Sequence, residues 1–279
     1  MSDCTSERLP MNRLKFGLIG HPIAHSLSPA LFKAGYGGEY TYDLIEEEDF
    51  SKAYDRFING YDAINVTAPF KEMAYGMADA ATPECRAIGA ANILIRQDDG
   101  TVLAANSDHF GVIGAVRAGL QPGMKISSTA LIAGCGGAAK AAAYAMGAAG
   151  YKTVILNRNL EKAVDFAGKL SAENGFDITA GPISDLPGWF RRAGIMIYTL
   201  PVATEEIRTL GDKDGGDKIL VEANYRDPAF TPDILKRMKS DNPGFTYVCG
   251  QEWLLHQAVG AFQAFTGKEP NINGMRKVL

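Results

Sequence analysis

The segment TALIAGCGGAAKAA at residues 129–142 combines three patterns that together predict the architecture of this chain. Its first five residues form a short apolar run that is typical of a buried parallel strand. Gly134, Gly136 and Gly137 interrupt that run, and the alanine-rich residues 138–146 have the composition of a helix that packs close to a sheet. A strand, a glycine turn and a helix in this order predict the dinucleotide-binding turn of a doubly wound α/β domain of Rossmann type.

Each part of this turn has a predicted task, although a tight turn without a ligand shows the same pattern. Gly134 allows the tight turn, Gly136 lets the backbone approach a pyrophosphate, and the small Ala139 allows close contact between helix and strand. Backbone N–H groups and the positive end of the helix dipole would hold the phosphates. We interpret Cys135 as a small turn residue rather than a nucleophile. The predicted cofactor contacts in the turn are Gly134, Cys135, Gly136, Gly137, Ala138 and Ala139.

The residues after the next strand favour NADP over NAD. Residues 152–156, KTVIL, predict that strand, and an NAD-binding unit would place an acid at its end for the ribose hydroxyls. This chain instead has Asn157 and Arg158 there, with Lys162 one helical turn later. A guanidinium binds a 2′-phosphate in a forked geometry, whereas a carboxylate would repel it. The alternative is that Arg158 and Lys162 only form a solvated helix start.

Composition narrows the class of protein. The chain has 279 residues, of which 46% are apolar, enough for one large or two ordinary α/β domains. A net charge of −4 argues against a nucleic-acid or anionic-membrane partner. The four cysteines lack metal spacing, so we expect a reduced, cytoplasmic protein without a metal site. We find neither a signal peptide nor an apolar run near the roughly 18 residues of a membrane span.

Two serines stand out near the start of the chain. Residues 1–10 are polar and predict a disordered leader, and KFGLIG at residues 15–20 predicts a buried strand that feeds GHPIAHSLSPALF at residues 20–32. In an extended backbone, the spacing of Ser26 and Ser28 points both hydroxyls to one side, where they can bind a carboxylate. The alternative for Ser28 is a helix cap before Pro29.

Polar residues also follow the next predicted strand, DAINVTAPFK at residues 62–71. Asn65 and Thr67 alternate with apolar residues, so a strand puts both on one face and delivers Lys71 just past its end. Ligands bind at the carboxyl ends of strands in open α/β sheets. Most lysines are solvated surface groups, but this position favours a catalytic role for Lys71.

A hairpin forms the third cluster. Residues 89–95 and 102–105 predict two strands joined by the turn Asp98-Asp99-Gly100. The hairpin brings Asn92 near residues 106–108, Asn-Ser-Asp. Asp108 has a plain alternative as the cap of the following helix.

The remaining elements alternate as expected for an α/β chain. We predict a strand at 40–45 and a helix at 46–59, then a helix to residue 170 and strands at 177–180, 194–200 and 218–223. The last long helix, 251–266, carries apolar residues at helical spacing, which we assign to the core: Leu254, Ala258, Ala261, Phe262 and Phe265. Gln257 falls on a flank that can face a cleft, and His256 is expected to be a surface or satisfied histidine.

Seven of these segments together resemble the shikimate dehydrogenase family. They run in the family's order over nearly all the chain after Met11. The matching segments are GHPIAHSLSP (20–29), NVTAPFK (65–71), GAANIL (89–94), NSDHFG (106–111), GCGGAA (134–139), NRNLEK (157–162) and GQEWLLHQA (250–258). The chain departs from the family pattern at Phe32-Lys33, where a His-Asn pair is usual, and at Trp253, where methionine is usual.

The resemblance implies a function and a role for each residue. The family reaction is the reversible, NADPH-dependent reduction of 3-dehydroshikimate to shikimate in chorismate and aromatic amino-acid biosynthesis, without a metal. Lys71 and Asp108 would be the catalytic pair: Lys71 would transfer the proton, and Asp108 would orient the lysine and the substrate. The substrate contacts would be Ser26 and Ser28 for the carboxylate, with Tyr225 near it, and Thr67, Asn92, Asp108 and Gln257 for the ring hydroxyls. The cofactor contacts would include Asn157, Arg158, Lys162 and Gly250, the last near the nicotinamide.

The resemblance also implies two α/β domains. We expect a substrate domain at residues 11–108, completed by residues 252–279, and a Rossmann NADP domain at residues 109–251, with hydride transfer in the cleft between them. We expect a monomer or homodimer. Two alternatives stay open: a quinate/shikimate dehydrogenase that uses NAD, and a non-catalytic metabolite sensor of the same fold.

Overall fold

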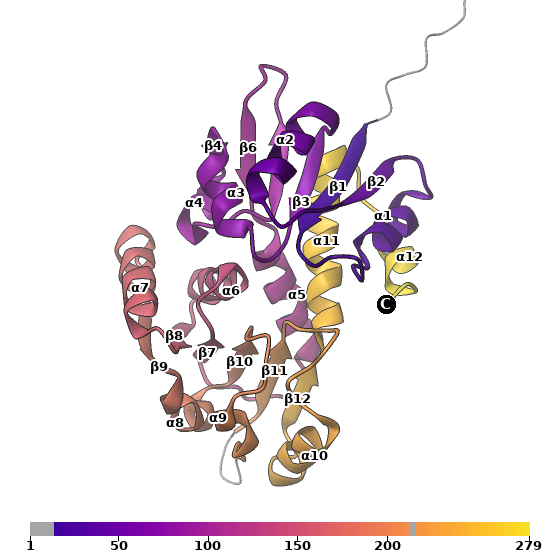
Figure 1. The fold of residues 1–279 in the computed structure, drawn as a ribbon. Coiled ribbons are helices and arrows are strands. Elements are labelled where there is room, and N and C mark those ends of the chain that lie inside the picture. Colours follow the sequence, from indigo (N-terminus) through magenta and orange to yellow (C-terminus); the bar gives the residue numbers. More distant parts are fainter. Residues whose placement is uncertain (1–13, 212–215) are drawn as a thin grey trace, which may run out of the picture.

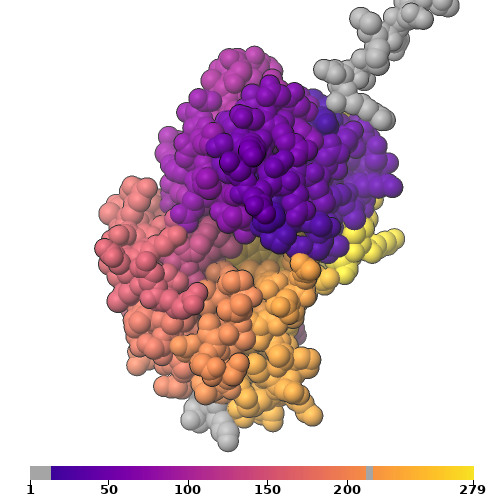
Figure 2. Space-filling view, in the orientation of Figure 1, coloured from indigo at the N-terminus to yellow at the C-terminus, as the bar shows by residue number. Residues whose placement is uncertain are grey.

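The computed structural model describes residues 14–211 and 216–279, so the leader expected at residues 1–10 lies outside the described residues. Within them the chain forms two six-stranded sheets, which lie one above the other in Figure 1. Helices cover both sheets, as the expected α/β class requires. In the space-filling view of Figure 2, the indigo and purple half around the first sheet meets the orange half around the second along a recess.

The first sheet is mixed. Its strands are β1 (Lys15–Gly20), β2 (Thr41–Glu46), β3 (Ala63–Val66), β4 (Ala80–Ala81), β5 (Ile93–Arg96) and β6 (Val102–Ala105). Their order in the sheet is β2-β1-β3-β5-β6-β4, and only the pairs β3–β5 and β5–β6 are antiparallel. The β5–β6 pair is the predicted hairpin. Its connecting helices are α1 (Ser28–Tyr36), α2 (Phe50–Gly60), α3 (Lys71–Met77) and α4 (Pro83–Ile88).

The second sheet is fully parallel and doubly wound. Its strands are β7 (Thr129–Ala133), β8 (Lys152–Asn157), β9 (Ile178–Pro182), β10 (Ile195–Tyr198), β11 (Lys218–Glu222) and β12 (Phe245–Val248). Their order is β12-β11-β10-β7-β8-β9, so the winding reverses between β7 and β10. Such a reversal opens a crevice at the carboxyl ends of the strands, where nucleotides bind in these folds. Its helices are α6 (Gly137–Ala148), α7 (Leu160–Asn174), α8 (Leu186–Arg192), α9 (Glu205–Arg208) and α10 (Pro232–Asp241), with the 3₁₀ turn η1 (Ile183–Asp185).

Two long helices join the halves. α5 (Asp108–Gly119) leads from β6 to β7, and α11 (Gly250–Thr266) leads from β12 back to the first sheet, where the short α12 (Ile272–Arg276) packs on α1. Figure 1 shows α5 and α11 side by side, and they contact each other along their length. The start of α11 buries Trp253 in the core of the second sheet, whereas Ala258 and Phe262 lie in the core of the first.

Most of the predicted elements are present, with shifted ends. The helix expected from residue 46 begins at Phe50, because the side chain of Asp49 accepts a hydrogen bond from the N–H of Ser51 and caps it. Leu254, which we assigned to the core, is only partly buried: it packs against the core of the first sheet and also lines the cleft, whereas the neighbouring Leu255 is fully buried. We did not predict β12 or α10.

Across residues 14–211 and 216–279, no group of three or more His, Cys, Asp or Glu side chains is arranged to hold a metal ion. None of the helices in these ranges has the length and apolarity needed to cross a bilayer.

Candidate active site between the two sheets

A cavity of about 470 Å³ lies between the two halves of the molecule. The first sheet and α11 supply its polar lining, and the loops after β10 and β11 close it from the second sheet. The predicted substrate residues that line it are Ser26, Ser28, Thr67, Lys71, Asp108, Tyr225 and Gln257. Segments far apart in the sequence therefore converge on one cavity.

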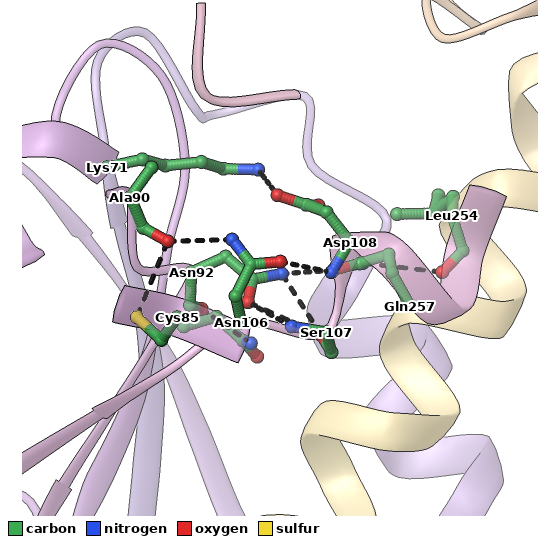
Figure 3. A network of polar contacts seen from close by, with 10 residues as sticks. Lys71, Cys85, Ala90, Asn92, Asn106, Ser107, Asp108, Leu254 and Gln257 are labelled. Carbon is green, nitrogen blue, oxygen red and sulfur yellow. Dashed lines mark hydrogen bonds and ion pairs between the residues drawn. The ribbon is translucent and has the colours of Figure 1, made fainter. Parts of the chain in front are cut away.

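The centre of the cavity holds a buried ion pair. Nζ of Lys71 lies 2.5 Å from Oδ2 of Asp108, and the two side chains are only 16% and 4% exposed (Figure 3). Lys71 is the first residue of α3 and Asp108 the first of α5. The interpretation of Asp108 as a helix cap is wrong, because its carboxylate makes no capping bond and points to Lys71 instead. A lysine at the cavity surface, oriented by a carboxylate, can pass a proton to or from a ligand.

Amide groups surround this pair. Nδ2 of Asn92 donates to Oγ of Ser107 at 3.0 Å and to Oε1 of Gln257 at 3.1 Å. Oδ1 of Asn92 accepts from the N–H of Ser107 at 2.7 Å, which fixes the orientation of the amide (Figure 3). The predicted approach of Asn92 to residues 106–108 is confirmed.

The two serines lie together, but not for the predicted reason. Residues 21–27 form bends and a turn rather than an extended strand, and Ser28 is the first residue of α1. Oγ of Ser26 donates to Oγ of Ser28 at 3.2 Å, and the N–H of Ser28 donates back to Oγ of Ser26 at 3.2 Å. The alternative of a helix cap at Ser28 is wrong, since Leu27 holds the cap position and Ser28 is the first residue of the helix.

Two residues of this polar network were not among the predicted substrate contacts: Asn65, although we expected it on the same face as Thr67, and Tyr42. Asn65 lines the cavity beside Thr67, and its Nδ2 donates to the carbonyl of Asn92 at 3.2 Å. Because that carbonyl can only accept, Oδ1 of Asn65 faces Tyr42, whose hydroxyl donates to it at 2.8 Å. The oxygen of Tyr42 is then left to accept from Ser28, with which it also hydrogen-bonds. The alternation of Asn65 with apolar residues was the sequence feature that could have indicated its place in the site. No feature of the sequence pointed to Tyr42.

The glycine turn has the predicted geometry. Gly134 has φ +115°, and a Cβ there would lie 2.5 Å from Oγ1 of Thr199, so the position requires glycine. A Cβ on Gly136 would meet open space, which leaves room for a ligand next to the start of α6. A Cβ on Gly137 would lie 3.2 Å from Cβ of Lys71. The turn therefore abuts the residue that carries the buried ion pair.

Cationic residues follow β8 as expected. Asn157 ends that strand, and its Nδ2 donates to the carbonyl of Asn159 at 3.0 Å. Arg158 is exposed, and Lys162 in the first turn of α7 reaches Glu72 of α3, with Nζ 3.2 Å from Oε1. Burial raises the pKa of the Cys135 thiol, in keeping with its interpretation as an inert turn residue.

A buried carboxyl group holds the loop that carries Tyr225. Oε1 of Glu222 accepts from the N–H of Ala229 and Oε2 accepts from the hydroxyl of Tyr247 at 2.8 Å. Burial raises the pKa of Glu222. A Cβ on Gly250 would lie 2.5 Å from the carbonyl oxygen of Ala223, so glycine lets α11 start against this loop. The loop thereby closes the cavity on the side of the serines, because Tyr225 lines it together with Ser26 and Ser28.

Comparisons with known proteins identify the family of the chain. The model of the shikimate dehydrogenase substrate binding domain matches residues 18–94. The NADP(+) shikimate dehydrogenase of Rubrobacter xylanophilus is 31% identical over 281 residues, covering 94% of each chain. Shikimate 5-dehydrogenase from Thermus thermophilus, solved in complex with NADP(H) and shikimate, has a TM-score of 0.77 and 29% identity, covering 95% of this chain and 100% of that one. Quinate dehydrogenase from Corynebacterium glutamicum, in complex with NAD, has a TM-score of 0.80 at 23% identity over 95% of this chain and 98% of that one, a likeness that shows the fold alone.

Proposed function

This chain belongs to the shikimate dehydrogenase family, and we propose that Lys71 and Asp108 carry the family's reaction in the cavity between its two sheets. The protein is an NADP-dependent oxidoreductase that interconverts 3-dehydroshikimate and shikimate, a step of aromatic amino-acid biosynthesis. The observation that supports these roles most strongly is the placement of the buried ion pair directly against the glycine turn, where Cβ of Lys71 is 3.2 Å from the position of a Cβ on Gly137.

The residues present fit an NADP molecule. The space over Gly136 and the start of α6 suit a pyrophosphate, while Arg158 and Lys162 suit a 2′-phosphate. Ala138 and Gly250 line the cavity beside Lys71, where the nicotinamide would lie. When bound, the nicotinamide supplies or takes the hydride.

Lys71 moves the proton that accompanies this hydride. During reduction, its ammonium donates a proton to the oxygen of the substrate carbonyl as that carbon gains hydride, and during oxidation its amine takes the proton back. Asp108 holds Nζ of Lys71 in place at 2.5 Å and contacts the reacting hydroxyl. Groups that act in this way contribute about 10²- to 10⁴-fold to the rate.

The other polar groups of the cavity orient the substrate. Ser26 and Ser28 bind its carboxylate, because their neutral hydroxyls can turn from each other to a stronger acceptor. Tyr225 closes over that end. At the other end, Thr67 and Gln257 bind the ring hydroxyls together with Asn92, which is buried behind the lining residues and hydrogen-bonds to Gln257. We add Asn65 to this set because it lines the cavity beside Thr67.

We also propose the wider organisation of the protein. Residues 11–108, completed by 252–279, form the substrate domain, and residues 109–251 form the NADP domain. The crossings along α5 and α11 support this division. Buried free thiols at Cys85 and Cys135 support a reducing, cytoplasmic location. The protein acts as a monomer or homodimer.

Initial rates measured by nicotinamide absorbance test the function. Shikimate and quinate are each offered with NADP⁺ and with NAD⁺. We expect rapid turnover with shikimate and NADP⁺ and a much lower kcat/KM for the other three pairs. Comparable rates with quinate or NAD⁺ would move the chain to the dual-specificity alternative. Binding of both ligands without turnover would support the metabolite sensor, which the intact ion pair argues against.

A further inference from the structure

A second charge cluster joins the two halves of the molecule, one residue away from Lys71. Glu72 lies on α3 beneath the first sheet, whereas Lys140 lies on α6 and Lys162 on α7 of the second. Nζ of Lys140 and Nζ of Lys162 are each 3.2 Å from the same atom, Oε1 of Glu72. We call these three residues the Glu72 cluster. It adds an electrostatic contact between α3 and α7 to the packing of α4 against α6 and α7.

The carboxylate in this cluster is ionised at neutral pH. Burial alone raises the pKa of Glu72, but the attraction of Lys140 and Lys162 outweighs burial and holds the pKa below its ordinary value. The cluster therefore holds two positive charges and one negative charge. The two ammonium groups can lie this close only because the carboxylate separates their charges.

The two lysines differ in how firmly they are held. The side chain of Lys140 is 13% exposed, and its Nζ also lies 5.4 Å from the centre of the Phe166 ring, a cation–π contact. The side chain of Lys162 is 43% exposed. Lys162 is therefore the member that can exchange partners, and it stands one helical turn after Arg158 at the end of β8.

We propose that Glu72 is a specificity-determining residue for the cofactor: it competes with the 2′-phosphate of NADP for Lys162 and so lowers the preference of the protein for NADP over NAD. This inference rests on the proposed role of Arg158 and Lys162. A phosphate within hydrogen-bonding reach of Nζ of Lys162 also lies close to the Glu72 carboxylate, and the two negative charges repel each other. NAD carries no 2′-phosphate, so its binding leaves the pair between Lys162 and Glu72 intact.

The competition has a structural consequence for the cleft. When the 2′-phosphate draws Lys162 away, α3 loses one of its two ionic contacts with the second half of the molecule. Binding of NADP, but not of NAD, therefore loosens the contact next to Lys71. In this way Glu72, on the substrate side of the cleft, responds to which cofactor is bound on the other side.

Equilibrium binding to the whole purified protein tests the proposal. The dissociation constants of NADP⁺ and NAD⁺ are measured by calorimetry for the wild type, Glu72→Gln and Glu161→Gln. Glu161 is the matched control, because it neighbours Lys162 on the same helix and its replacement removes the same charge. We expect Glu72→Gln to tighten NADP⁺ binding about two- to fivefold, the upper part of the range for an exposed ion pair, and to change NAD⁺ binding less than twofold. Glu161→Gln should change NADP⁺ binding less than twofold, and added salt should shrink the effect of Glu72→Gln.

Three results would overturn the proposal: unchanged or weaker NADP⁺ binding in Glu72→Gln, an equal gain for NAD⁺, or an equal gain in Glu161→Gln. A Lys162→Ala variant separates this failure from failure of the proposed cofactor site. If Lys162→Ala weakens NADP⁺ binding while Glu72→Gln has no effect, the site stands and the competition is wrong. If Lys162→Ala leaves NADP⁺ binding unchanged, the proposed 2′-phosphate site is wrong, and the competition fails with it.

Discussion

Replacing Lys71 by Met and Asp108 by Asn, singly and together, tests the buried ion pair. Nζ of Lys71 lies 2.5 Å from Oδ2 of Asp108, and the side chains are 16% and 4% exposed. Removing one partner of a buried pair costs roughly 3–5 kcal/mol, because the other charge stays behind without compensation. The double variant leaves no charge behind. We therefore expect it to lose less stability than the sum of the two single losses.

The two single variants should also differ from each other. Asp108 is the first residue of α5, and a carboxylate at a helix N-terminus is stabilised by about 0.3–1 kcal/mol, and by more when partly buried. Lys71→Met leaves that carboxylate in its favourable field. Asp108→Asn instead leaves the ammonium of Lys71 facing the positive end of the same helix. We expect Asp108→Asn to be the less stable single variant by about 1 kcal/mol.

Urea unfolding at pH 7 measures the four free energies of unfolding. The cycle should give a coupling energy of about 2 kcal/mol or more. A coupling below roughly 0.5 kcal/mol, or a less stable Lys71→Met, would refute the reasoning. Turnover should not follow stability. All three variants should lose about 10²- to 10⁴-fold in kcat, because Lys71→Met and the double variant have no group to move the proton, and Asp108→Asn no longer holds Lys71 in place. If the double variant regained turnover together with stability, Lys71 would not be the proton donor.

Three further outcomes are expected. Ser26→Ala and Ser28→Ala should each raise the KM for shikimate about tenfold, which is the effect of losing a charge-assisted hydrogen bond, and should change kcat less. Steady-state rates measure both constants, and an unchanged KM in both variants would exclude the serines as the carboxylate site. Burial raises the pKa of Glu222, so the folded state holds its proton to higher pH than the unfolded state, and stability falls as pH rises from the ordinary carboxyl range through the folded value. Glu222→Gln should abolish that slope in unfolding experiments that start at about pH 4 and go upward. Gly136→Ala should leave thermal stability unchanged but weaken NADP⁺ binding, because its Cβ would enter the open space at the turn. Gly134→Ala should instead lower the melting temperature, because Gly134 has a φ of +115° and lies close to Thr199. Equal behaviour of the two variants would contradict the tasks assigned to the two glycines.

The sequence was informative where local chemistry dictates local structure. The apolar run before Gly134, the glycines and the alanines specify a strand, a turn and a helix without help from distant residues, and all three are present. The hairpin turn at Asp98-Asp99-Gly100 likewise fixed the approach of Asn92 to Ser107, because a short turn leaves the two strands only one register.

It was less informative where the outcome depends on competition or on distant packing. Pro29 draws Ser28 into the first turn of a helix, which overrides the extended backbone that the alternating pattern suggests. Tyr42 reaches Asn65 across β1, which pairs with both of their strands, so no spacing along the chain reveals their contact. The partners of Glu72 lie on helices of the other sheet, and a lone glutamate on α3 resembles any solvated charge.

The path of the chain through α5 and α11 bears on how the protein is made. The face of the first sheet that contains Phe16 and Ile93 is covered by Ala258 and Phe262, more than 150 positions further along the chain. A growing polypeptide leaves the ribosome from its N-terminus, so this sheet emerges first, and yet this one face lacks the cover of α11 until that helix is synthesised. The strands of the second sheet all lie between those two segments, and once β12 is made the interior of that sheet lacks only Trp253, at the start of α11. The half of the molecule that is translated first therefore reaches its final packing last, and its exposed apolar strands are the part that chaperones would need to shield during synthesis.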